Sequence, residues 1–142
     1  MKKRIVISAI LLLLAAVSFY LVLQPRPNLL ILFTHDLHSN LDEYNLPAVG
    51  ERIISAGGYA RLSGAIEKER RGREKYTLVA DAGDYSMGTL FHTIRSDYSA
   101  ELVAMGAMGY DITTFGNHDF EFGPEELASS LLAAKANSTG QL

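Results

Sequence analysis

Three short apolar stretches of this chain each end in a cluster of polar residues, and this pattern limits the possible folds more than any other. The stretches cover residues 28–34, 76–80 and 111–115. Each has the length and the branched or aromatic content of a buried strand. Helical patterns alternate with them, at residues 59–70, 97–108 and 124–136. The alternation predicts an α/β fold whose strand–helix–strand units form a mostly parallel sheet.

Residues with metal-binding side chains follow every one of these predicted strands. After the first strand come Asp36 and His38, after the second comes Asp84, and after the third come Asn117 and His118. The loops at the carboxyl ends of parallel strands gather at one edge of a sheet, where ligands bind. In an extended segment, residues two apart point the same way, so Asp36 and His38 can hold one ion together.

The composition restricts the chemistry of such a site. The chain has 142 residues, which is enough for one domain at most, and it has no cysteine. Disulfides and thiolate zinc sites are therefore excluded. Oxygen and imidazole ligands without sulfur suit zinc, manganese, iron or cobalt equally. All 16 acidic residues lie beyond residue 23, so the main part is more acidic than the net charge of −3 suggests, and we expect no nucleic acid polymer as a partner.

The N-terminus has the pattern of a membrane-targeting segment. A basic end, residues 1–4, precedes residues 5–23, which contain no charge, glycine or proline. As a helix this run would span about 28 Å, close to the hydrocarbon thickness of a bilayer. We expect a signal anchor that places the following domain outside the cytoplasm, in the periplasm or at the cell surface; a cleaved signal peptide and a secreted protein are the alternative. Residues 24–27 then form a proline-containing linker, and the domain covers 28–142.

Several motifs together resemble a known enzyme family. Asp36-x-His38, Gly83-Asp84 and Gly116-Asn117-His118-Asp119 are similar to the signature of calcineurin-like metallophosphoesterases. Other stretches resemble the branch of this family that contains 5'-nucleotidases and 2',3'-cyclic-nucleotide phosphodiesterases, namely residues 57–62 (GGYARL), 81–84 (DAGD) and 109–111 (GYD). The resemblance covers about residues 28–137. It implies a partial metallophosphoesterase sandwich that hydrolyses phosphate esters of nucleotides outside the cytoplasm.

The resemblance also implies which residues hold the cofactor, a pair of divalent metal ions. Asp36 and His38 would bind the first metal. Asp84 would bridge both metals, and Asn117 would bind the second through its amide oxygen.

In the same comparison, His118 is a catalytic residue and not a ligand. It would lie over the substrate phosphate and stabilise the charge that develops during hydrolysis. An acid three residues further on orients this histidine in the family, and Glu121 occupies that position here. Asp81, at the end of the second predicted strand, either supports the site or forms a turn, and His35 would point away from its neighbour Asp36.

The family's site needs further histidines, including a Gly-His-x-His stretch, and none follows His118. The resemblance therefore implies an incomplete N-terminal portion, inactive by itself, of an enzyme that also has a base-binding C-terminal domain. Two other functions remain open. One is a non-catalytic, membrane-anchored module that binds metal or a partner. The other is a thiosulfohydrolase-like relative that uses the same metal site.

Overall fold

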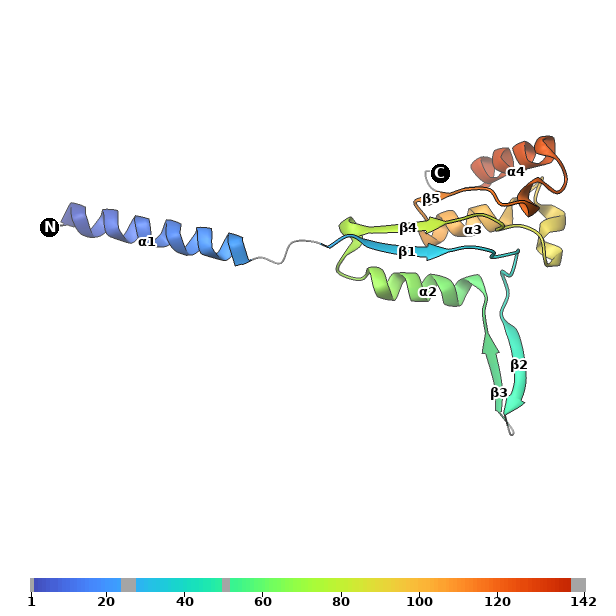
Figure 1. Cartoon of the computed structure of the whole chain (residues 1–142), viewed down its shortest axis with the longest axis horizontal. Helices are drawn as coiled ribbons and strands as arrows, with labels where there is room; N and C mark the ends of the chain where they lie inside the picture. Colours follow the sequence, from blue (N-terminus) through green and yellow to red (C-terminus); the bar gives the residue numbers. More distant parts are fainter. Residues whose placement is uncertain (1, 24–27, 50–51, 139–142) are drawn as a thin grey trace.

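A computed structural model describes residues 2–23, 28–49 and 52–138 (Figure 1). Its helices and strands are α1 (Lys2–Leu23), β1 (Leu30–Thr34), β2 (Tyr44–Val49), β3 (Arg52–Ala56), α2 (Tyr59–Arg70), β4 (Thr77–Asp81), α3 (Ala100–Met108), β5 (Ile112–Thr113) and α4 (Pro124–Asn137). Short 3-10 turns lie at Glu74–Tyr76, Leu90–Ile94 and His118–Phe120. The predicted α/β class and the alternation of strands with helices are confirmed.

The strands β1, β4 and β5 form a parallel sheet in that order. Thr34 pairs with Asp81, and Asp81 pairs with Thr113, so the last residues of the three strands lie in one row. The third strand is shorter than the predicted residues 111–115. Asp111 lies just before it. Its N–H donates to the Val79 carbonyl at 2.9 Å, and its carboxylate accepts a hydrogen bond from the Val79 N–H at 2.8 Å.

One face of this sheet is buried beneath helices and the other is not. Leu32 and Val79 lie on the covered face, and Val79 is fully buried. A core cluster joins the helices and the loops, and consists of Tyr59, Tyr85, Leu102, Met105 and Ala134. Helix α3 ends as predicted at Gly109, whose φ of 79° is a left-handed conformation that glycine adopts without strain.

A hairpin that the sequence pattern did not predict lies between β1 and α2. Strands β2 and β3 pair in antiparallel fashion, with Tyr44 opposite Ala56 and Leu46 opposite Ile54. The pairing is irregular between Leu46 and Val49, next to a proline that cannot donate to a ladder. Figure 1 shows this hairpin projecting from the carboxyl end of β1, away from the sheet.

The start of the helix predicted at residues 97–108 was wrong by a few residues. The helix α3 begins at Ala100 and not at Asp97. The preceding chain forms a separate turn, in which Asp97 N–H donates to the Ile94 carbonyl at 3.2 Å. Ser99 then adopts a left-handed conformation, with a φ of 48°, which separates this turn from the helix.

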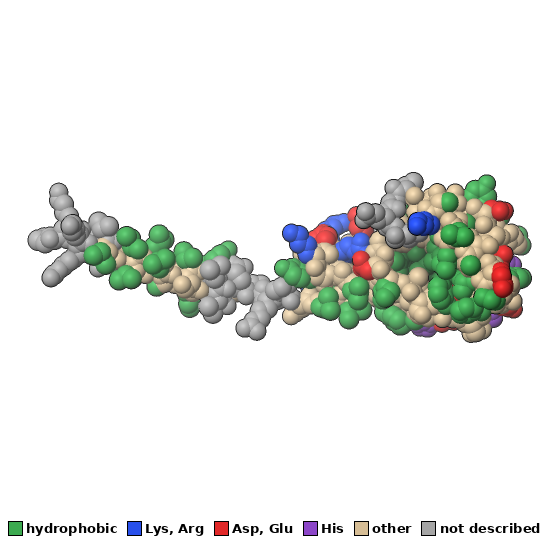
Figure 2. All heavy atoms as spheres, turned by 90° about the horizontal axis from the view of Figure 1, so that it is seen from above, with side chains coloured by type: hydrophobic (Ala, Val, Ile, Leu, Met, Phe, Trp, Pro, Cys, Tyr) green, Lys and Arg blue, Asp and Glu red, His purple; other side chains and the backbone are tan. Residues whose placement is uncertain are grey.

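The N-terminal run predicted at residues 5–23 is helical and lies within α1. Figure 2 shows hydrophobic side chains along the visible side of the described part of this helix. Several hydrophobic residues of the helix are exposed, including Leu12 and Leu13. Within the described part of the chain, no helix meets the combined length and hydropathy required to cross a bilayer. The linker predicted at 24–27 and Met1 of the basic end lie outside the described residues.

Candidate metal centre

The loops that follow the three parallel strands are joined to one another by backbone hydrogen bonds. Asp36 N–H donates to the Gly83 carbonyl at 3.0 Å, and His38 N–H donates to the Asp84 carbonyl at 3.0 Å. Gly83 has a φ of 94°, and a Cβ atom there would lie 2.3 Å from the Gly116 nitrogen. Only glycine therefore allows the loops after β4 and β5 to approach this closely.

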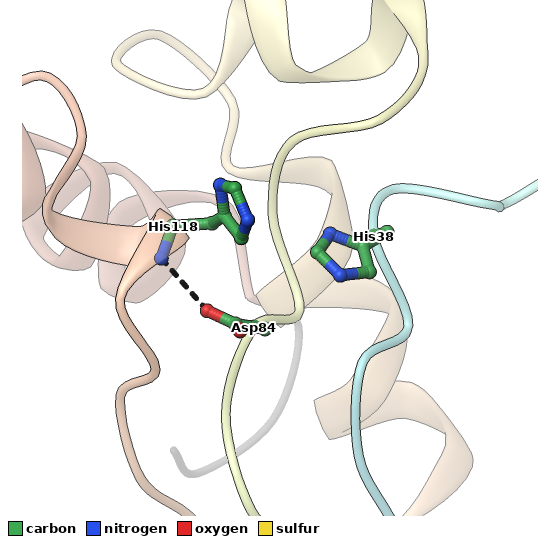
Figure 3. A group of neighbouring side chains, drawn as sticks. All are labelled: His38, Asp84 and His118. Atoms are coloured by element: carbon green, nitrogen blue, oxygen red, sulfur yellow. Dashed lines mark hydrogen bonds between the residues drawn. The ribbon is translucent and has the colours of Figure 1, made fainter.

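Three of the predicted site residues meet at this edge. His38, Asp84 and His118 come from the loops after β1, β4 and β5, and one ligand atom from each lies within 4.8 Å of the others (Figure 3). The two imidazole rings are 5.2 Å apart in an edge-to-face arrangement. The backbone N–H of His118 donates to Asp84 Oδ1 at 2.8 Å. This group is the most compact potential metal site among the described residues.

Asp36 lies beside this group, and the reason differs from the predicted one. Its Oδ1 is 3.4 Å from His38 Nε2. Both residues have left-handed backbones, with φ of 53° and 47°, so a turn and not an extended segment brings their side chains together. The turn also reverses the expected position of His35, whose Nδ1 lies 2.5 Å from Asp36 Oδ2. This contact holds the pKa of Asp36 below its usual value.

Asn117 lies on the other side of Asp84. Its amide oxygen is 3.3 Å from Asp84 Oδ2, and its amide nitrogen is 3.3 Å from the nitrogen of His118. Two acceptor oxygens facing each other are favourable with a cation between them. Rotating the amide would instead let its nitrogen donate to Asp84. Only the first arrangement directs the amide oxygen of Asn117 toward an ion held by Asp84.

His118 and Glu121 form the pair that the sequence resemblance implies. The turn His118–Phe120 brings their side chains together, and Nδ1 of His118 lies 2.6 Å from Glu121 Oε2. This hydrogen bond raises the pKa of His118 above its usual value. With Nδ1 occupied, Nε2 is the ring nitrogen that can face a metal or a phosphate.

Asp81 is a buried support of the site. Thr34 Oγ1 donates to it at 2.6 Å, Thr113 Oγ1 at 3.0 Å and the Gly83 N–H at 2.9 Å. These donors come from β1, from β5 and from the loop that follows β4. Of its two expected roles, the structure therefore favours support of the strand ends.

Sequence reasoning missed one residue at this edge, Asp119. It was named above only as part of a motif, yet its side chain is completely buried and accepts hydrogen bonds from the loops after β4 and β5. Its sequence neighbour Glu121 is exposed. Both are acids in one polar stretch, and only the 3-10 turn at His118–Phe120 decides which of them faces inward. A sequence pattern carries no signal for that turn.

The backbone and the donor atoms both fit a bound cation. Left-handed non-glycine residues gather in the two loops after β1 and β4, at Asp36, His38, Ser39, Asp84 and Met87. Such conformations cost free energy and concentrate at functional sites. Carboxylate, amide oxygen and imidazole donors suit a divalent transition metal or zinc. The arrangement can therefore hold a cation and place an imidazole beside it.

Comparison with curated proteins supports this chemistry. No protein-family model matches the chain. The chain is 39% identical over 114 residues to a 5'-nucleotidase of Bos taurus, and 40% identical over 106 residues to a probable 5'-nucleotidase of Treponema pallidum. The matches cover 75% and 72% of this chain, but only 19% and 18% of those relatives. The chain thus spans about a fifth of the length of the relatives it matches.

Two solved structures share its fold. An NAD nucleotidase of Haemophilus influenzae superimposes with a TM-score of 0.62 at 33% identity, over 74% of this chain and 19% of that protein. A calcineurin-like phosphoesterase of Bacillus subtilis superimposes with a TM-score of 0.59 at 28% identity, over 75% of this chain and 34% of that protein.

Proposed function

Because this chain belongs, over about 75% of its length, to the 5'-nucleotidase family of calcineurin-like metallophosphoesterases, we propose that its metal-binding edge hydrolyses phosphate esters of nucleotides. The observation that carries the proposal is the convergence of His38, Asp84 and His118 from three separate strand ends. Relatives and structural neighbours are named as nucleotidases or phosphoesterases, so divalent metal use follows from the family. The number of ions and the substrate are part of the proposal.

In this proposal the edge holds two metal ions. Asp36 and His38 would hold one ion, Asn117 would hold the other, and Asp84 would be shared by both, which its closeness to His38 and Asn117 supports. Two divalent cations about 3.5–4 Å apart supply polarisation of a phosphoryl group and activation of water. The chain's own contribution is to fix the donors, and the hydrogen bonds between its loops do this.

His118 acts on the substrate and not on the metals. Glu121 binds Nδ1, which leaves Nε2 as the ring nitrogen that can face the substrate. The same hydrogen bond raises the pKa of His118 and so favours the imidazolium form, which can stabilise negative charge or donate a proton to the departing oxygen. The proximity of His118 to His38 and Asp84 also fits a role as a metal ligand. The metal content of His118→Ala distinguishes this role from catalysis.

The direct test is hydrolysis by the protein expressed from its complete gene. We expect metal-dependent phosphate release from AMP, and no comparable release of thiosulfate from a thiosulfonate carrier. Preference for the thiosulfonate would contradict the nucleotide assignment. Metal binding without hydrolysis of either compound would favour the non-catalytic module.

The location outside the cytoplasm is a separate part of the proposal. It rests on residues 5–23, whose uncharged pattern is that of an export signal. Fractionation of cells that express the complete gene, with N-terminal sequencing of the mature protein, tests it. Recovery of the whole protein in the cytoplasmic fraction would contradict it.

A further inference from the structure

Asp119 and Glu121 are two acids of one short segment with opposite environments. The Asp119 side chain is completely buried, whereas Glu121 is exposed and contacts His118. Oδ2 of Asp119 accepts hydrogen bonds from the Asp84 N–H at 2.8 Å and the Gly116 N–H at 2.9 Å. Oδ1 accepts from Ser86, from its N–H at 3.2 Å and its hydroxyl at 2.7 Å. The carboxylate is therefore fully bonded without contact to solvent.

The donors belong to the two loops that carry the candidate ligands. Asp84 and Ser86 are in the loop after β4, and Gly116 is in the loop after β5. The connection is reciprocal, because the Asp84 carboxylate in turn accepts the His118 N–H at 2.8 Å. Each loop thus supplies a carboxylate that binds backbone N–H groups of the other. A Cβ atom on Gly116 would lie 2.1 Å from Asp84 Oδ1, so only glycine fits at position 116.

A buried cation lies beside Asp119 and contacts its backbone carbonyl rather than its carboxylate. Arg95 is only 2% exposed, and its Nη2 donates to the Asp119 carbonyl at 3.1 Å. Its guanidinium also lies over the Phe122 ring, 5.8 Å from the centroid. A buried carboxylate is costly unless it is bonded and compensated, and hydrogen bonds to a charged acceptor are roughly twice as strong as neutral ones. Asp119 therefore forms a stronger bridge between the loops than a neutral side chain would.

We propose that Asp119 is a positioning residue, which locks the two loops together and so sets the separation of Asp84 from Asn117 and His118. This role rests on the proposed function, because it concerns the same metal site. Asp119 touches neither a ligand atom nor the substrate position. It acts through the Asp84 backbone on one side and the Gly116 backbone on the other.

Two substitutions change the bridge in different ways. Asp119→Asn keeps the size but places an amide NH₂ where a carboxylate oxygen accepts. The NH₂ is tolerated best toward Ser86, whose hydroxyl can turn to accept, so one backbone bond is lost. Asp119→Ala removes all four bonds. We therefore expect the effect of alanine to exceed that of asparagine.

Asp111→Asn is the matched control. The Asp111 carboxylate also joins β4 to the segment of β5, through the Val79 N–H, but before the amino end of β5 and not in the loops that carry the site. It should lower stability without changing the site. Ser86→Ala is a milder second variant that removes only the 2.7 Å hydroxyl bond to Asp119.

The experiment measures Mn²⁺ binding by calorimetry, steady-state kinetics and thermal unfolding, on protein expressed from its complete gene. We expect Asp119→Asn and Asp119→Ala to weaken Mn²⁺ binding by about 10- to 100-fold in protein that is still folded, as loss of a residue that orients a ligand does. These two variants should also hydrolyse substrate more slowly, and excess Mn²⁺ should partly restore their rate. A purely structural role of Asp119 would not give this rescue. Ser86→Ala should change the affinity in the same direction but less, and Asp111→Asn should leave it unchanged.

Unchanged Mn²⁺ affinity in folded Asp119→Asn or, if that variant does not fold, in Ser86→Ala would overturn the positioning role. An equal loss of affinity in Asp111→Asn would also overturn it, because the effect would then reflect general destabilisation. If the unaltered protein bound no Mn²⁺, the proposed function itself would fail, and the role of Asp119 with it.

Discussion

The carboxyl-end edge and the open face of the same three strands contrast sharply. At the edge, hydrogen bonds to carboxylates and close glycine contacts join the loops after β4 and β5. On the open face, Ile31 and Phe33 of β1 and Ile112 of β5 are 57%, 62% and 59% exposed. The edge is thus determined by directional bonds inside the described residues. The face carries apolar surface that only a further layer would bury.

Loss of His118 should give the largest effect at the edge. His118→Ala should lower kcat by about 10²–10⁴-fold, because charge stabilisation or proton donation is lost, while the metals stay bound. Metal analysis and kinetics on the same preparation check this. Loss of metal together with recovery of activity on metal addition would make His118 a ligand instead.

Asn117→Ala should produce the opposite pattern. Removing the amide oxygen should weaken metal binding by at least about tenfold, and excess metal should partly restore the rate. Metal titration of the rate measures both quantities. A rate loss that no metal concentration reverses would argue against Asn117 as a ligand.

The two faces of the sheet can be compared by one substitution on each. Val79→Ala, on the covered face, should lower the free energy of unfolding by about 1–3 kcal/mol, because a fully buried side chain leaves a cavity. Phe33→Ser, on the open face, should change it by about 0.5 kcal/mol or less if that face is exposed. A loss of about 3 kcal/mol or more in Phe33→Ser would reveal that something covers the face. Denaturant titration measures both.

The smallest effect concerns the pH range of the His118–Glu121 pair. Glu121 raises the pKa of His118, so the imidazolium persists to higher pH than in an isolated histidine. The hydrogen bond between the His118 imidazolium and Glu121 stabilises the fold fully below the ordinary histidine pKa. This contribution is lost as the pH rises through the raised pKa of His118. In metal-free Glu121→Gln, NMR titration should show this pKa shifted down. An unchanged pKa would mean that the contact does not form in solution.

The sequence predicted the parts of the fold that follow from local pattern. Strands β1 and β4 and helices α2 and α4 have clear apolar periods, and parallel topology then placed Asp84 and His118 at one edge. The hairpin of β2 and β3 was missed, because a proline and an irregular ladder obscure its alternation. The nearness of Asp36 and His38 was predicted for the wrong reason, since left-handed backbones at both residues leave no trace in a pattern.

Burial of polar side chains was the least predictable property. Asp119 and Glu121 have the same charge and lie two residues apart. The turn in this segment buries Asp119, which connects two loops, and leaves Glu121 exposed in contact with His118. The open face was equally hidden. Ile31 and Leu32 are both apolar in sequence, and the arrangement of the helices decides which one is covered.

Metal content and AMP hydrolysis, measured together for the unaltered protein and for Asp84→Asn, test the central claim most directly. Asp84 is the residue proposed to be shared by both ions. We predict two divalent ions per chain and phosphate release from AMP for the protein expressed from its complete gene, and loss of both in Asp84→Asn. Full metal content in Asp84→Asn, or phosphate release that survives removal of metal by a chelator, would contradict a two-metal phosphoesterase site at this edge.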